Sequence, residues 1–112
     1  MSSAADKLEE FRRAWMDADN NYQADMTAAT GDADLTHDIE TNWWTHQANW
    51  ARAATAALEQ NSAAVNACYT QAKQANDDTV AARKKAQDIV QIVGDSGGAA
   101  KSLTALLKAL AT

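Results

Sequence analysis

Proline is absent from the 112 residues, and cysteine occurs once, at Cys68. A single cysteine excludes an intramolecular disulfide. Bulky apolar residues are also scarce, because leucine, isoleucine, valine and phenylalanine together supply only 15 residues. This share is below that of an ordinary globular core. The shortages disfavour an all-β domain, a doubly wound α/β enzyme and a disulfide scaffold.

Basic residues are missing from one long stretch, since no lysine or arginine lies between Arg13 and Arg52. A region of one charge sign repels nucleic acid and attracts a basic partner, or it is simply a solvated face. Direct nucleic-acid binding is disfavoured, because the only dense basic run is Arg83-Lys84-Lys85. The candidate acidic patch consists of the acids in this stretch: Asp17, Asp19, Asp25, Asp32, Asp34, Asp38 and Glu40.

Targeting and membrane signals are missing as well. Residues 1–7 contain no apolar run of the kind found in a secretory signal peptide. No stretch approaches the roughly 20 apolar residues that a membrane span needs. We therefore expect a cytoplasmic protein, or one exported without a cleaved signal peptide, and we expect no membrane partner.

Alanine is what the chain has in abundance, with 27 of the 112 residues. Apolar and small residues recur at steps of three and four, which is the spacing of helices in bundles and coiled coils. Ser3 followed by Asp6 predicts a capped helix start, and Gly31 suits the left-handed turn after the first helix. The pattern predicts helices over about 3–30, 35–61 and 62–93, a glycine-rich linker at 94–98, and an amphipathic helix at 99–112.

These elements predict an all-α fold built on an antiparallel helical hairpin. The hairpin would place Phe11, Trp15 and Tyr22 against Trp43 and Trp50. We favour a break near Asn61 over one continuous helix from 35 to 93, because Asn and Ser prefer caps to helix interiors. Residues 62–93 then have little to pack against. Either the chain folds back into a three- or four-helix bundle, or a second chain covers them, and we slightly favour the oligomer.

No catalytic, cofactor-binding or metal-binding residues are predicted. His37 and His46 are nine positions apart, which puts them on opposite faces of one helix. We expect His46 to be a hydrogen-bonded core residue and His37 to be exposed. A calcium loop beginning at Asp32 would need glycine and glutamate where His37 and Trp43 stand. The spacing shows no phosphate-binding glycine loop and no nucleophile with its base, so we predict that the protein is not an enzyme.

The tryptophans and the last leucines are the candidate partner contacts. Trp44 is rotated about 100° from the stripe that holds Trp43 and Trp50, so it lies at the edge of the core face. Tryptophan in such a position often anchors an interface. The candidate interface residues are Trp44, Leu103, Leu106, Leu107 and Leu110.

The first functional hypothesis is a non-enzymatic helical interaction protein that associates with itself or with a protein partner. A second is an acidic inhibitor or mimic that binds the basic surface of a nucleic-acid enzyme. A third comes from a resemblance. Small, proline-free helical hairpins rich in Ala, Asn, Gln and Thr resemble subunits or substrates of bacterial secretion systems, such as WXG proteins and needle subunits. The Trp-x-Gly turn of the WXG proteins is missing here, because the first turn reads Thr30-Gly31-Asp32.

Overall fold

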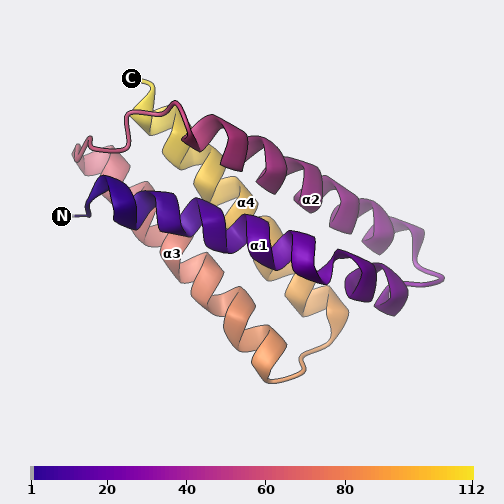
Figure 1. The fold of residues 1–112 in the computed structure, drawn as a ribbon. Helices are drawn as coiled ribbons and strands as arrows, with labels where there is room; N and C mark the ends of the chain where they lie inside the picture. Colours follow the sequence, from indigo (N-terminus) through magenta and orange to yellow (C-terminus); the bar gives the residue numbers. More distant parts are fainter. Residues whose placement is uncertain (1) are drawn as a thin grey trace.

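The computed structural model describes residues 2–112, which form an all-helical bundle. Its four helices are α1 (Ala4–Ala28), α2 (Ala33–Ala53), α3 (Ala63–Lys84) and α4 (Ile89–Leu110). Figure 1 shows two antiparallel hairpins, α1 with α2 and α3 with α4. They meet at the end that holds both termini and diverge toward the other end. The all-α prediction and the fold-back into a bundle are confirmed.

The packing order around the bundle is α1, α2, α4, α3. Helix α1 packs on all three other helices, whereas the backbones of α2 and α3 do not approach closely within the described chain. Helices α2 and α4 run in the same direction, because residues further along α2 bond to residues further along α4. His46 bonds to Ser96 and Asn49 bonds to Thr104.

Each helix begins at a capping side chain. Ser3 and Asp6 form the predicted capping box, and the carboxylate of Asp32 accepts the Leu35 amide. Ser62 and Asp88 cap α3 and α4 in the same way. A side-chain oxygen at this position satisfies an amide that the helix itself leaves unpaired. The local signals for helix starts in the sequence are therefore used directly by the fold.

The predicted break near Asn61 is confirmed, but α2 ends earlier than expected. It stops at Ala53 instead of about residue 61, and residues 54–62 form a loop. This loop closes the end of the bundle, since it buries Leu58 in the core and places Gln60 where its amide donates to the carbonyl of Leu110. Burial of Leu58 overrides the helix propensity of the alanines around it.

The predicted helix over 62–93 and the predicted linker at 94–98 are wrong. The chain reverses at Lys85–Asp88, and α4 runs without interruption through Gly94, Gly97 and Gly98. The reversal contains no glycine and relies on Ala86, whose φ of 51° lies in the left-handed region. Each glycine inside a helix costs about 1 kcal/mol relative to alanine. The apolar stripe on either side, from Ile92 to Leu110, compensates by packing the helix along its whole length.

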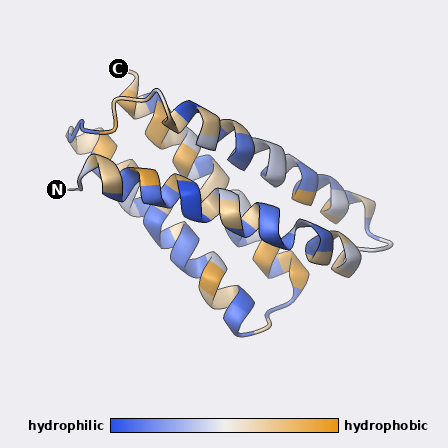
Figure 2. Ribbon diagram, in the orientation of Figure 1, coloured by the Kyte–Doolittle hydropathy of each residue, from blue (hydrophilic) through white to orange (hydrophobic). Residues whose placement is uncertain are grey.

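The core divides into two apolar clusters with a polar layer between them. The cluster near the termini has Phe11, Val65, Leu103 and Leu106 at its centre, and the cluster near the Gly31 turn is smaller. Helix α4 is the most hydrophobic of the four helices (Figure 2). Side chains of the polar layer are His46, Asn49, Asn76, Thr79 and Ser96.

The aromatic pairing predicted for the hairpin is confirmed. The ring of Trp43 lies 5.3 Å from that of Trp15 and 5.8 Å from that of Tyr22. Trp50 packs against the cluster that contains Phe11. Tilted ring pairs at these distances are favourable. The tryptophans therefore join α1 to α2 where the alanines alone would leave little contact area.

Candidate interaction surface

The leucines predicted as partner contacts are core residues, so that part of the prediction is wrong. Leu103 and Leu106 have no exposed surface, Leu110 is buried, and Leu107 packs partly buried against the same cluster. The error follows from the turn at Lys85–Asp88. Because that turn folds α4 back along α3, the leucines find their apolar partners within the chain.

Trp44 lies at the surface, with 63% of its area exposed. Its ring stands edge-on against Trp43 at a centroid distance of 4.9 Å. Trp43 is itself fixed, because its Nε1 donates to the Asp19 carboxylate over 3.1 Å. Trp44 is therefore held on a rigid aromatic support. Its role as a partner contact remains a prediction.

The seven acids do not form one patch. Asp17 and Asp25 turn toward α3, where both bind the guanidinium of Arg83 at 2.8–2.9 Å. Asp19 accepts the bond from Trp43. The remaining four acids are exposed around the start of α2: Asp32, Asp34, Asp38 and Glu40. The sequence shows these charges, but it does not show that Arg83 of α3 pairs with Asp17 and Asp25.

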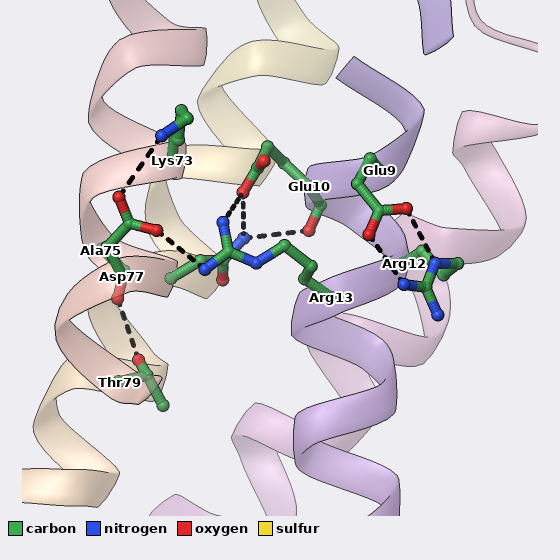
Figure 3. A network of polar contacts seen from close by, with 9 residues as sticks. Glu9, Glu10, Arg12, Arg13, Lys73, Ala75, Asp77 and Thr79 are labelled. Carbon is green, nitrogen blue, oxygen red and sulfur yellow. Dashed lines mark hydrogen bonds and ion pairs between the residues drawn. The ribbon is translucent and has the colours of Figure 1, made fainter. Parts of the chain in front are cut away.

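Polar contacts join α1 and α3 beyond the apolar cluster that holds Phe11 and Val65. Arg13 bridges Glu10 on its own helix and Asp77 on α3, each at 2.8 Å (Figure 3). The Asn76 amide donates to the Glu10 backbone carbonyl and carboxylate. The hydrogen bond from Arg13 lowers the pKa of Asp77 below its ordinary value.

Arg83 is the most strongly held charge between α1 and α3. Burial alone would lower its pKa, but the hydrogen bonds to Asp25 and Asp17 outweigh burial and raise the pKa above its ordinary value. Four hydrogen bonds join this one guanidinium to the two carboxylates. Paired contacts of this kind hold two helices in one register. These polar contacts add to the apolar packing that α1 and α3 share near the termini.

His46 is the buried core histidine that the sequence predicts. Its Nε2 lies 3.1 Å from the carbonyl oxygen of Ser96 and 3.3 Å from the hydroxyl, while Nδ1 has no hydrogen-bond partner among the described residues. A small cavity of about 10 Å³ adjoins the ring, and Asp17, Asn76 and Thr79 are among the residues that line it. Burial lowers the pKa of His46, although Ser96 and Asp17 oppose this shift.

The His46 environment predicts a loss of stability in mild acid. The unfolded chain takes up a proton near pH 6.5, whereas the folded chain resists protonation because its pKa is lowered. The free energy of unfolding should therefore be constant above about pH 7 and fall below pH 6.5, by at most about 1.4 kcal/mol per pH unit, until the folded pKa is reached. Urea unfolding at pH 5.0–7.5 measures this slope.

The control for this measurement is the exposed histidine of the same helix. His46→Gln should flatten the slope between pH 5 and 7, whereas His37→Gln, whose side chain is in solvent, should keep the slope of the unmodified protein. An unchanged slope in His46→Gln would show that other groups cause the acid sensitivity.

A groove runs between α2 and α4 and has a volume of about 730 Å³. Asn42 lies across its floor, since its amide donates to the Val93 carbonyl over 3.1 Å. Val90 stands on one wall with 60% of its area exposed. The groove is lined by Leu35, Asp38, Thr41, Asn42 and Thr45 of α2 and by Val90, Val93, Gly94, Gly97, Gly98, Ala100, Lys101 and Thr104 of α4.

The groove cannot be predicted from the sequence as long as residues 94–98 are taken for a linker. Gly94 and Gly98 are four residues apart, so a helical interpretation would have placed them on one face together with Val90. We call this groove, together with its charged lining residues Asp38 and Lys101, the α2/α4 face.

The described helices include none that is both long and apolar enough to cross a membrane. Residues 2–112 also bring no three His, Cys, Asp or Glu side chains together in a metal-binding arrangement. Comparison of the chain with protein families, with curated proteins and with solved structures found no match.

Proposed function

We propose that this protein is a non-enzymatic helical interaction protein, which associates with itself or with a protein partner through the α2/α4 side of the bundle. The observation that carries the proposal is the open groove of about 730 Å³, flanked by exposed Val90. Trp44, on the outer surface of α2, is the other large apolar side chain with more than half of its area exposed. Exposed apolar side chains beside an open groove are typical of a docking surface.

The acidic-mimic hypothesis has less support. Its patch loses Asp17 and Asp25 to Arg83, which leaves only the acids around the start of α2 to meet a basic partner. No specific contact supports the secretion-system hypothesis, which stays a resemblance of composition.

Light scattering combined with a hydrophobic fluorescent dye tests the proposed function. We expect either a mass above the 12.0 kDa of one chain, or a monomer that binds the dye through its exposed apolar side. The physical reason is that a docking surface must be covered by protein or remain accessible to the dye. A compact monomer that does not increase the fluorescence of the dye would contradict the proposal.

Trp44→Ala is a useful companion variant in the same assay. Trp44 stands edge-on against Trp43 and is 63% exposed, so the fold should survive its removal. Met16→Ala removes a partly exposed side chain from α1 and is the matched control. Equal dye binding by both variants would exclude Trp44 from the docking surface.

A further inference from the structure

Two glycines of α4 have no explanation within the single chain. A Cβ at Gly97 would lie 3.4 Å from the side chain of Asn42, so Gly97 already has a neighbour within the chain. A Cβ at Gly94 or Gly98 would meet nothing within 4 Å, and neither residue has a positive φ. Both destabilise the helix relative to alanine. What they provide is an open surface that the backbone of another helix can approach closely.

The charges at the two ends of the groove are opposite. Asp38 lies on the α2 wall near Val90, and Lys101 lies on the α4 wall one turn before Thr104. Because α2 and α4 run in the same direction, Asp38 belongs to the end near the Gly31 turn and Lys101 belongs to the end toward the chain termini.

Further charged residues extend this polarity along both helices. Asp34 precedes Asp38 by one turn, Arg52 follows it by about four turns on the same side of α2, and Lys108 follows Lys101 by two turns on α4. All are exposed, and none of these side chains, nor Asp38 or Lys101, forms an ion pair within residues 2–112. The α2/α4 face is thus acidic at one end, small and weakly apolar in the middle, and basic at the other end.

We propose that the α2/α4 face binds the same face of a second copy of this chain, with the two copies antiparallel. A two-fold axis through the middle of the groove brings the acidic end of each copy to the basic end of the other, so that Asp38 faces Lys101 twice. This self-complementarity is what a symmetric dimer interface requires. Gly94 and Gly98 let the two α4 helices approach one another near the centre of the face.

A partner of one charge sign would match only one end of the face and would leave the other end repelled. Only an oppositely polarised surface satisfies both ends, and a reversed copy of the chain has one. From Asp34 to Arg52 the face is about 27 Å long at 1.5 Å per residue, and it is two helices wide. The inference rests on the proposed function and names its partner.

Sedimentation velocity from about 1 to 200 μM, near the range of weak self-association, tests the dimer. The mass should rise from 12.0 kDa toward twice that value. Asp38→Lys and Lys101→Asp should each weaken dimerisation by more than about tenfold, because each creates two like-charge contacts. The double variant Asp38→Lys/Lys101→Asp should restore it. Lys84→Asp, an equal charge change at an exposed site on α3, should have no effect.

Gly98→Leu separates docking from folding. Because the site is open in the single chain, the variant should have an unchanged or higher melting temperature, yet it should remain a monomer. Loss of the dimer in both single charge variants and its return in the double variant support the proposal.

A dimer with an unchanged dissociation constant in the charge variants and in Gly98→Leu overturns the assignment to this face, although the proposed function survives. A monomer over the whole concentration range overturns self-association. If that monomer binds the hydrophobic dye, the face serves a different protein, and if it does not, the proposed function fails too.

Discussion

Phe11→Ala is expected to lower the free energy of unfolding by about 3–5 kcal/mol. Phe11 is the only phenylalanine in the chain and is 1% exposed, in the core cluster near the termini. Its neighbours include Ala14 and Ala53, whose short side chains cannot move in to fill the space. The lost stability is a large part of the roughly 5–15 kcal/mol of a small domain. Urea unfolding followed by circular dichroism measures the change.

Leu8→Ala on the same helix is the matched control. Leu8 is 37% exposed, so its removal opens no enclosed cavity and should cost less than about 1 kcal/mol. The melting temperature of Phe11→Ala should fall by about 10–20 °C, and that of Leu8→Ala by only a few degrees. Similar losses in the two variants would mean that Phe11 is not at the centre of a packed cluster.

The features that depend on local periodicity could be predicted from the sequence. The all-α class, the capped start at Ser3, the turn at Gly31 and the aromatic hairpin all follow from spacings within one or two helices. Burial of His46 follows from its position between Trp43 and Trp50 on one stripe. In each case, the residues that decide the outcome are close together along the chain.

The second reversal could not be predicted in this way. The run at 94–98, with three glycines, is the strongest breaker in the sequence, yet it is helical, while the glycine-free Lys85–Asp88 forms the turn. Long-range packing of Ile92 and Leu103 stabilises α4 as one helix, and Ala86 takes a positive φ to allow it. Propensity is a weak prior where an apolar stripe continues on both sides of a breaker.

The candidate surface was only partly predictable for a related reason. Trp44 is on the surface, as its rotation from the Trp43 stripe indicates. The leucine spacing of α4 predicts an apolar face on this helix but not whether that face packs on the same chain or on a partner, and in the fold it packs on the same chain. The groove and its charge polarity depend on α2 and α4 lying parallel, which no local pattern specifies.

Arg83→Ala is expected to lower the free energy of unfolding by about 3 kcal/mol. Arg83 makes four hydrogen bonds to Asp17 and Asp25, and all three side chains are less than one-fifth exposed. Removing the guanidinium leaves two partly buried carboxylates close together without a counter-charge, which is costlier than the loss of the contacts themselves. Denaturant unfolding at pH 7 measures the change. Lys84→Ala removes the neighbouring exposed charge and should alter stability by less than about 0.5 kcal/mol.

A neutral replacement of the whole cluster distinguishes this mechanism from lost packing. In Arg83→Met/Asp17→Asn/Asp25→Asn the carboxylates are gone, so no uncompensated charge is left, and Met retains much of the apolar stem of arginine. Such replacements are often neutral or stabilising. The triple variant should therefore be more stable than Arg83→Ala by about 2 kcal/mol. If it is as unstable as the single variant, the guanidinium acts through its packing and hydrogen bonds, and the two carboxylates do not repel one another enough to matter.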